Sequence, residues 1–348
     1  MKTWKIGLIG TGWWSEKHLG AWTSLPNTLV GALCNRSKPK MEARAIEFHI
    51  PPHLLFTDAD EMLASADIDI VDICTGPESH LEYVKKASAA GKHILCQKPF
   101  AQTYDEAVEM VEIAEKNGVR MMVTENWRWL MPFRTIKNVI DSGKLGKIRV
   151  ARYIHSDWYS PRMNYDAIIP QPFFREMPHL LFYEMGAHWY DTWRSLFGTP
   201  DRLYAEISSI SPFITGEDSG IITLGYKDWY GFMDMSWATR QKLENPPKVP
   251  IGPEHLEQMI IDGDLGTLKL FTDGKITLVS KNGDTESVIE EKTWLDHQNS
   301  HILLSAHFID CLEKEEPFVT SGRDNLDTMK MVFATYQSAK SHEVVILT

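Results

Sequence analysis

The chain has 348 residues, which exceeds the about 250 to 300 residues at which a single hydrophobic core stops growing, so two domains are expected. No apolar run approaches the about 20 residues that span a bilayer, and the net charge of −11 includes no basic stripe, which argues against membrane and nucleic-acid partners. Four scattered cysteines show no metal-type spacing. We therefore expect a soluble cytoplasmic protein without an export signal that acts on a small polar ligand.

The first part of the chain alternates short β-rich runs with helical patterns. The expected strands are residues 5–10, 29–34, 69–74, 93–97 and 120–123, and the expected helices are 41–48, 81–90 and 105–118. This alternation is typical of a doubly wound parallel sheet. Residues 1–126 are therefore predicted to form an α/β Rossmann domain.

The pattern changes near residue 127. A helix over 132–143 leads into a long strand over 147–158, and further strands follow one another at 202–210, 221–226, 231–240, 260–271 and 276–283. Successive strands favour an antiparallel sheet. Residues 127–348 are predicted to form an α+β domain with an open, largely antiparallel sheet for substrate binding and oligomerisation, closed by helices at 303–316 and 325–340. One option is that the last helix packs back on the first domain.

A glycine turn follows the first expected strand, in the stretch Gly10-Thr-Gly12-Trp13-Trp14-Ser15. Gly10 permits the tight turn, Gly12 lets the backbone approach a pyrophosphate, and Ser15 replaces the third glycine of a dinucleotide-binding fingerprint. The phosphates would lie at the following helix N-terminus. Trp13 and Trp14 are interpreted as walls around nicotinamide or substrate.

The second expected strand ends about 20 residues further on, where the ribose-reading residue of such a fingerprint belongs. The position is Asn35, followed by Arg36, Ser37 and Lys38. Asn35 can donate to a ribose hydroxyl or to a 2′-phosphate, and Arg36 with Ser37 could hold that phosphate. The cofactor is therefore predicted to be NAD or NADP, and the choice stays open.

Three further motifs follow in order: "TGPESH" (75–80), "CQKPF" (96–100) and "EMGAH" (184–188). Together with residues 10–18 they resemble the glucose-fructose oxidoreductase and inositol dehydrogenase family over nearly the whole chain. Within it, "ENWRW" (125–129) and "QPFFRE" (171–176) are most similar to sugar dehydrogenases of the D-apiose type. The resemblance implies an enzyme that oxidises a CH–OH group of a carbohydrate or polyol. A homodimer or homotetramer is expected for a separate reason: the helices of the second domain are too few to cover both faces of its sheet, so the open face should pair with a second subunit.

The resemblance also implies a catalytic lysine. The family's Glu-Lys-Pro motif supplies a lysine that touches the nicotinamide ribose and the reacting carbinol, and here it is Lys98, followed by Pro99. Gln97 stands in place of the glutamate, which removes a charge beside Lys98. Gln97 and Lys98 are both assigned to the cofactor site.

The second catalytic element of the family is Asp-x-x-x-His with histidine as the base. This chain reads Glu184-Met-Gly-Ala-His188, and residues four apart on a helix share one face. A histidine titrates near neutrality, which suits removal of a hydroxyl proton while hydride leaves the same carbon. Asp191 is expected either to orient His188 or to pair with Arg194.

The remaining site predictions concern the cofactor and the substrate. Thr75, Gly76, Pro77 and His80 resemble the family's Thr-Pro-x-x-x-His segment, whose backbone lines the dinucleotide. No metal site is expected, because the candidate ligands lie on separate elements without a recognised spacing: His155, Asp157, His179 and His188. Besides Lys98, Glu184 and His188, the residues assigned to the substrate are Asn126, Arg128, Asp157, Trp158 and Arg175.

Three functions compete. The first is an NAD(P)-dependent sugar or polyol dehydrogenase, and the second is a glycoside-cleaving relative in which a retained cofactor oxidises the sugar transiently. The third is a non-enzymatic dinucleotide sensor, against which Lys98, Glu184 and His188 argue, since a sensor needs only the first domain.

Overall fold

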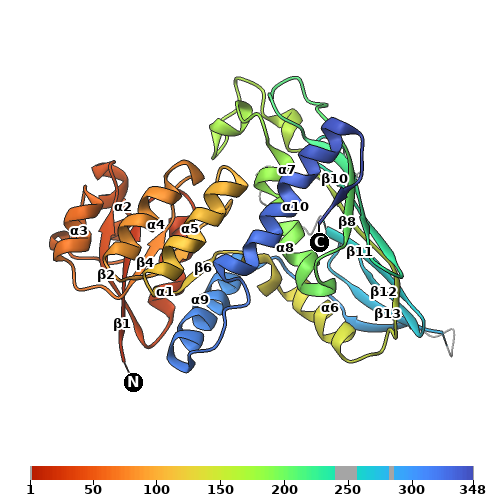
Figure 1. Cartoon of the computed structure of the whole chain (residues 1–348), viewed down its shortest axis with the longest axis horizontal. Helices are drawn as coiled ribbons and strands as arrows, with labels where there is room; N and C mark the ends of the chain where they lie inside the picture. Colours follow the sequence, from red (N-terminus) through yellow and green to blue (C-terminus); the bar gives the residue numbers. More distant parts are fainter. Residues whose placement is uncertain (1, 240–256, 282–285, 348) are drawn as a thin grey trace. The chain divides into compact units, whose positions relative to one another are not determined.

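The computed structural model describes residues 2–239, 257–281 and 286–347, so the ends of two expected strands, Arg240 and 282–283, lie outside the described residues (Figure 1). The chain divides into two compact units: unit 1 is Met1–Trp129 with His297–Met329, and unit 2 is Leu130–Asp296 with Lys330–Thr348. The first boundary lies three residues from the predicted one. The predicted second domain, 127–348, differs in that residues 297–329 group with unit 1.

Unit 1 contains a six-stranded sheet of order β3-β2-β1-β4-β5-β6, in which every neighbouring pair is parallel. The predicted doubly wound sheet is confirmed, with an additional two-residue strand, β3. The strands are β1 (Trp4–Ile9), β2 (Thr28–Cys34), β3 (Leu55–Phe56), β4 (Ile70–Ile73), β5 (His93–Cys96) and β6 (Met121–Val123). The helices are α1 (Ser15–Ser24), α2 (Lys38–Glu47), α3 (Ala59–Ser65), α4 (His80–Ala89), α5 (Tyr104–Lys116) and α9 (His297–Lys314).

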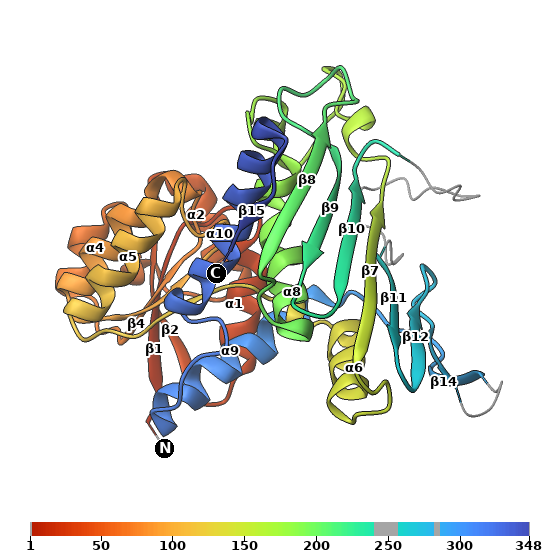
Figure 2. The ribbon, with the colours of Figure 1, turned by 45° about the vertical axis from the view of Figure 1, so that its right-hand side comes forward.

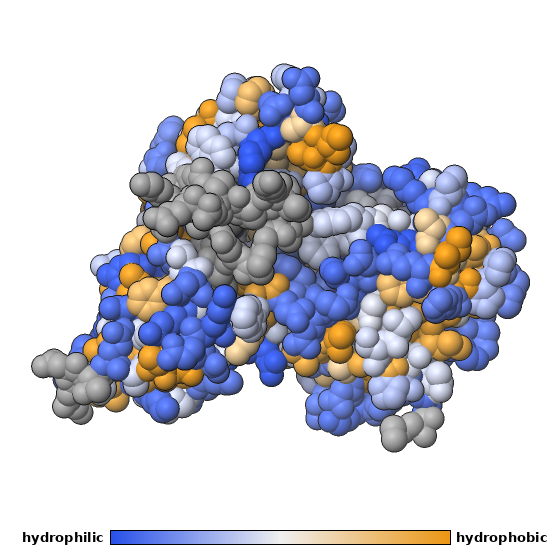
Figure 3. All heavy atoms as spheres, turned by 180° about the vertical axis from the view of Figure 1, so that it is seen from behind, coloured by the Kyte–Doolittle hydropathy of each residue, from blue (hydrophilic) through white to orange (hydrophobic). Residues whose placement is uncertain are grey.

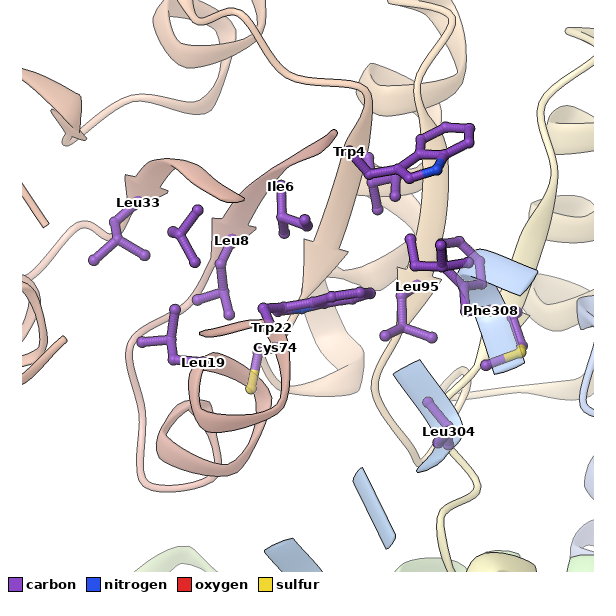
Figure 4. Close-up of a cluster of buried hydrophobic side chains, with 14 of the residues drawn as sticks. Trp4, Ile6, Leu8, Leu19, Trp22, Leu33, Cys74, Leu95, Leu304 and Phe308 are labelled. Atoms are coloured by element: carbon purple, nitrogen blue, oxygen red, sulfur yellow. The ribbon is translucent and has the colours of Figure 1, made fainter. Parts of the chain in front are cut away.

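The core of unit 1 explains why α9, which is distant in sequence, belongs to it. In Figure 4, Trp22 of α1 lies among side chains of the sheet, and Leu304 and Phe308 of α9 belong to the same buried cluster. Trp22, Leu304 and Phe308 are each 0% exposed. Burying side chains of this size contributes about 1.5 to 3 kcal/mol each, so separating α9 from this sheet would be strongly unfavourable.

Unit 2 is built on a nine-stranded sheet of order β14-β13-β12-β11-β7-β10-β9-β8-β15, and Figure 2 shows its central strands side by side. Every pair is antiparallel except β7 with β10, so the predicted largely antiparallel sheet is confirmed. The strands are β7 (Ile148–Ser156), β8 (Arg202–Ser208), β9 (Ser219–Gly225), β10 (Tyr230–Ser236), β11 (Glu257–Gly263), β12 (Gly266–Leu270), β13 (Ile276–Ser280), β14 (Glu286–Glu290) and β15 (Val345–Ile346). The helices are α6 (Met131–Asp141), α7 (Leu181–Glu184), α8 (Gly186–Phe197) and α10 (Gly322–Ser341), which begins in unit 1.

Helices of unit 2 cover one face of this sheet, and among the described residues no helix of this unit covers the other face (Figure 1). Tyr153 of β7 packs against Phe133 of α6, and both are buried. On the alternate positions of the strands, Ile221 and Tyr230 are about half exposed, at 53% and 52%. Figure 3 shows one side of the molecule, on which hydrophobic residues form separate patches between hydrophilic ones.

None of the helices in the described ranges is long and apolar enough to cross a membrane.

Candidate active site

The glycine turn joins β1 to α1 at the carboxyl edge of the parallel sheet. Gly10 has a φ of +97°, and a Cβ added there would lie 2.5 Å from the carbonyl oxygen of Cys74 at the end of β4. Only glycine tolerates both conditions. The turn therefore lies at the carboxyl ends of β1 and β4. The strand order reverses between these two strands, and doubly wound sheets bind ligands at such a switch point.

Gly12 is different, because a Cβ added there would meet no atom within 4 Å. The space in front of it is open, and the N-cap residue of α1, Trp14, makes no side-chain capping hydrogen bond. Backbone N–H groups at such a helix N-terminus favour an anion. These residues fit the pyrophosphate of a dinucleotide, whose close approach explains a glycine at a position where the fold alone does not require one.

Ser15, which stands where the fingerprint has its third glycine, is 0% exposed. Its hydroxyl donates to the Gly12 carbonyl at 2.6 Å and accepts from Nε of Arg44 at 3.2 Å. A second Arg44 nitrogen donates to the Trp13 carbonyl at 3.3 Å. Arg44, which the sequence analysis did not single out, therefore ties α2 to the turn through the serine hydroxyl.

The two glycines predict different outcomes on substitution. Gly12→Val should leave the free energy of unfolding nearly unchanged but weaken NAD binding at least about tenfold, or ~1.4 kcal/mol. Gly10→Ala should instead cost about 1 to 3 kcal/mol of stability through strain at positive φ. Thermal unfolding and fluorescence titration with NAD measure the two effects, and unchanged NAD affinity in Gly12→Val would contradict the assignment.

The two tryptophans of the turn have different environments. Trp13 is 41% exposed, so its ring is available to line a bound cofactor. Trp14 packs against the hydrophobic cluster of unit 1, with its ring 5.7 Å from His297 and 6.0 Å from His301 of α9. Trp14 therefore packs against α9. The sequence had suggested only that both tryptophan rings line the nicotinamide or substrate site, and this packing role was not predicted.

Asn35 follows β2 and is oriented by its neighbours. Its amide nitrogen donates to the Thr11 hydroxyl at 2.7 Å and to the Ser37 carbonyl at 3.2 Å. Both amide hydrogens are thus used inside the turn, which corrects the expectation that Asn35 can donate to a ribose or a phosphate. The atom left toward a ligand is the acceptor Oδ1. Arg36 and Lys38 are exposed, and Lys38 lies 3.9 Å from Glu42.

The segment after β4 is shaped by His80. This histidine is 0% exposed, and its two ring nitrogens lie 3.0 Å from the carbonyl oxygens of Thr75 and Phe100. Burial lowers the pKa of His80 despite these two acceptors. His80 therefore lies between two backbone segments and contacts both of them: the segment after β4, with Thr75, and the segment after β5, with Phe100.

Gln97 and Lys98 follow β5, and each is 7% exposed. Behind them lies a buried polar group that the sequence analysis missed: His18 of α1, whose Nδ1 is 2.9 Å from Oδ2 of Asp72 on β4. The Gln97 amide nitrogen lies 3.1 Å from the other ring nitrogen of His18. The sequence contained one indication of this pair: Asp72 is a charged residue within the otherwise apolar strand β4, and a buried carboxylate needs a polar partner.

Two predicted substrate residues of unit 1 are engaged within it. The Asn126 amide donates to the Ser300 hydroxyl at 2.8 Å, which ties the end of β6 to α9. Arg128 donates to the Val319 carbonyl at 2.9 Å and lies 3.7 Å from the Asp324 carboxylate. These contacts hold the 319–324 segment, and a role in substrate binding stays a prediction for both residues.

In unit 2, Glu184 and His188 do not share one uninterrupted helix as expected. α7 ends at Glu184 and α8 begins at Gly186, with Met185 between them in near-helical conformation (φ −93°, ψ −31°). Backbone bonds from Met185 to Leu181 and from Trp189 to Met185 carry the helical path through the break. Glu184 (8%), His188 (4%) and Asp191 (0%) are all buried, and their spacing of four and three residues places them on one side of this helical path.

The start of α7 is fixed by a buried carboxylate, Glu217. It accepts hydrogen bonds from the backbone N–H of Leu180 and Phe182 at 3.2 and 2.9 Å, and from the Tyr336 hydroxyl at 2.6 Å. A carboxylate at a helix N-terminus satisfies N–H groups that lack intrahelical partners. Glu217 thereby fixes the start of α7, the helix that ends at Glu184. No local sequence pattern predicts this role of Glu217.

A second buried pair lies beneath α8. His155 of β7 lies 2.7 Å from Glu257 of β11, and its ring is 5.1 Å from that of Trp189. Burial opposes a charge on His155, yet the Glu257 carboxylate raises its pKa. Trp189 is 1% exposed, so it is a core residue.

The loop from 157 to 176 holds the remaining candidates. Asp157 accepts from the Trp158 N–H at 2.6 Å and lies 3.4 Å from Arg162, and Trp158 is 43% exposed. Arg175 donates to three backbone carbonyls, those of Met163, Asn164 and Ala167, so its guanidinium organises the loop. Beside it lies a hollow of about 510 Å³, lined by Tyr165, Pro172, Phe173, Arg175, Glu176, Phe213, Ile214 and Thr215.

Within the described residues no group of three or more His, Cys, Asp or Glu side chains could hold a metal ion.

This combination of a glycine turn at the switch point of a parallel sheet with a separate α+β unit defines a class of dinucleotide-dependent enzymes. The family model "Oxidoreductase family, NAD-binding Rossmann fold" matches residues 4–125, and "GFO/IDH/MocA C-terminal domain" matches residues 133–269. The chain belongs to the GFO/IDH/MocA oxidoreductase family. The family, the oxidoreductase class and the NAD-binding domain expected from the sequence are thereby confirmed.

Individual relatives are similar over their whole length. A D-apiose dehydrogenase from Paraburkholderia graminis is 33% identical, over 100% of this chain and 90% of the relative, and another from Rhizobium rhizogenes is 30% identical, over 98% and 96%. A crystal structure of an oxidoreductase from Agrobacterium radiobacter in complex with NAD+, L-tartaric acid and magnesium has a TM-score of 0.89 at 29% identity, over 99% of both chains.

Proposed function

We propose that this chain is a dehydrogenase that oxidises a secondary or ring hydroxyl of a sugar or polyol, with NAD as hydride acceptor. The observation that carries the proposal is the conjunction of the open Gly12 turn with the buried Lys98 at the same carboxyl edge of one sheet. The whole-chain similarity to two D-apiose dehydrogenases supports a carbohydrate substrate.

Two steps are assigned to residues of this chain: transfer of the substrate's hydroxyl proton, and stabilisation of the negative charge that forms on the substrate oxygen. The Lys98 ammonium donates a hydrogen bond to the substrate oxygen and stabilises the negative charge that develops there. His188 accepts the hydroxyl proton, and Glu184 is held in the same buried region of unit 2 to orient the base or the substrate. When bound, the nicotinamide supplies the acceptor for the hydride that leaves the same carbon as the proton leaves oxygen.

The Asn35 geometry favours NAD over NADP. The amide hydrogens of Asn35 are bonded to Thr11 and Ser37, which leaves the acceptor Oδ1 for a ligand. Oδ1 can accept a hydrogen bond from a ribose 2′-hydroxyl but repels the oxygens of a 2′-phosphate. The exposed Arg36, which follows Asn35, could offset this preference by binding a phosphate.

A panel of pentoses, hexoses and polyols tests the function, with formation of reduced cofactor followed by absorbance in the presence of NAD or NADP. Net reduction of NAD by at least one member supports the dehydrogenase. Cleavage of a glycoside without net reduction would favour the glycoside-cleaving alternative, and binding without either reaction would favour a sensor.

We also propose that the chain forms a homodimer or homotetramer in the cytoplasm. The uncovered sheet face of unit 2 carries Ile221 and Tyr230, half exposed, and such apolar side chains favour a second subunit. The four cysteines are all free and buried, which agrees with a reducing compartment.

Sedimentation at micromolar concentration should therefore give twice or four times the monomer mass of 39.8 kDa. Placing a charge on the open face with Ile221→Lys should shift this mass toward the monomer, because it would bury an unpaired ammonium in an interface. A monomeric wild-type chain at that concentration would contradict the proposed assembly.

A further inference from the structure

A line of hydrogen-bonding groups runs through unit 1 from β4 to the backbone of the proposed catalytic lysine. Trp22 Nε1 donates to Asp72 Oδ2 at 2.7 Å, and His18 Nδ1 lies 2.9 and 3.0 Å from the two oxygens of the same carboxylate. The Gln97 amide nitrogen is 3.1 Å from His18 Nε2. Gln97 Oε1 accepts from the backbone N–H of Lys98 at 2.7 Å.

All members of this line are removed from solvent. Asp72 is 0% exposed, His18 and Trp22 are at most 1% exposed, and Gln97 and Lys98 are 7% exposed. A buried donor or acceptor that loses its partner costs about 1 to 3 kcal/mol, so each group here constrains the next. A side chain at position 97 must therefore satisfy the His18 ring and the Lys98 N–H together.

A glutamine can do this for only one protonation state of His18. With Oε1 bound to the Lys98 N–H, the amide faces His18 with its NH₂ group, which needs a ring nitrogen without a proton. That arrangement belongs to a neutral ring protonated at Nδ1, the nitrogen that faces Asp72. If His18 carries protons on both nitrogens, Nε2 needs an acceptor, and the amide can provide one only by turning over and withdrawing Oε1 from Lys98.

The charged and titratable surroundings of His18 act in opposite directions. Burial lowers its pKa, whereas the Asp72 carboxylate and the nearby Cys74 outweigh burial and raise it well above the usual value. From α9, the His301 ring lies 4.8 Å away, centroid to centroid. The Gln97 amide links this titration to a backbone group of the proposed site, the N–H of Lys98.

We propose that Gln97 is a positioning residue that couples the protonation of His18 to the backbone at Lys98. While His18 is neutral, Gln97 anchors the Lys98 N–H; when His18 takes up a proton, the amide turns and the anchor is lost. The glutamate of the family motif would lack this coupling, because a carboxylate accepts from a protonated His18 and from the Lys98 N–H at the same time. The catalytic consequence rests on the proposed role of Lys98.

Histidine and backbone ¹⁵N NMR of the full-length protein tests the coupling without any substrate. In the wild type, the His18 ring and the Lys98 amide should titrate with one midpoint. In Gln97→Glu, the His18 midpoint should rise by about 1 to 3 pH units, the shift expected from a carboxylate in hydrogen-bond reach, and the Lys98 amide should stay constant while His18 titrates. The matched control is Gln102→Glu, the same change at an exposed position of the following segment, which should leave both titrations unchanged.

Separate titrations of His18 and Lys98 in the wild type, or an unchanged His18 midpoint in Gln97→Glu, would overturn the coupling. The pH profile of kcat then measures its consequence: the wild type should lose activity as pH falls through the His18 midpoint, and Gln97→Glu should shift that loss with the midpoint. If Lys98→Met is fully active while the NMR coupling is present, the role of Lys98 is wrong and the coupling stands.

Discussion

Lys98→Met is expected to lower the rate of hydride transfer by about 10² to 10⁴-fold or more, because it removes the donor proposed to stabilise negative charge on the substrate oxygen. Methionine retains most of the length and volume of the lysine stem, so packing around this 7% exposed position should change little. Single-turnover reduction of NAD, with a substrate found in the panel, measures the loss.

Two controls separate chemistry from folding in this experiment. Lys116→Met makes the same change at an exposed position of α5 and should keep the wild-type rate. Fluorescence titration should show NAD bound by Lys98→Met with an affinity within about tenfold of the wild type, since the open Gly12 turn is intact. If Lys98→Met transfers hydride at the wild-type rate, the Lys98 ammonium does not stabilise the substrate oxygen.

The sequence could predict the parts of unit 1 that depend on local periodicity. A run such as 5–10 has the largely apolar character of a strand buried on both faces. The helical spacing of 105–118 ends in an Asn-Gly pair at which α5 also ends in the structure, with Gly118 at φ +67°. The glycine turn was predictable because positive φ and close backbone approach leave glycine as the only suitable residue at position 10.

Contacts between distant segments were not predictable in this way. Periodicity indicates that α9 buries Leu304 and Phe308, but it does not say against which sheet, so the domain boundary was placed without residues 297–329. Likewise, the amide of Asn35 could be assigned a donor role from its residue type alone. Its orientation depends on Thr11, a residue 24 positions away.

The partners of polar residues around the proposed site also depend on contacts between distant segments and were not predictable from the sequence. The aspartate in the run of β4 contradicts an apolar strand, and this conflict between residue type and burial marks Asp72 as a residue with a specific partner. The identity of that partner, His18, follows from the packing of α1 on the sheet. Arg175 was assigned to the substrate, which stays a prediction. Its three bonds to backbone carbonyls also hold the loop together, and its residue type does not indicate this second role.

His188→Ala tests the proton acceptor and is expected to reduce turnover by about 10² to 10⁴-fold, the usual contribution of a general base. NAD binding should be nearly unaffected, because His188 lies in unit 2 and the glycine turn lies in unit 1. His188→Gln keeps a hydrogen-bonding side chain but cannot titrate, so it should be about as slow as the alanine variant. His53→Ala, a truncation at an exposed histidine of unit 1, is the matched control and should keep the wild-type rate.

The pH dependence of single-turnover hydride transfer decides between His188 and its neighbour. Only a neutral histidine ring accepts a proton, so His188 as the base adds a rise of the wild-type rate with pH, and both His188 variants should lack this rise and keep only the dependence that follows the His18 midpoint. If His188→Ala instead transfers hydride at the wild-type rate between about pH 6 and 9, the base lies elsewhere. Glu184, buried at the end of α7 and held there through Glu217, is then the first candidate, and Glu184→Gln would have to produce the loss expected of His188→Ala.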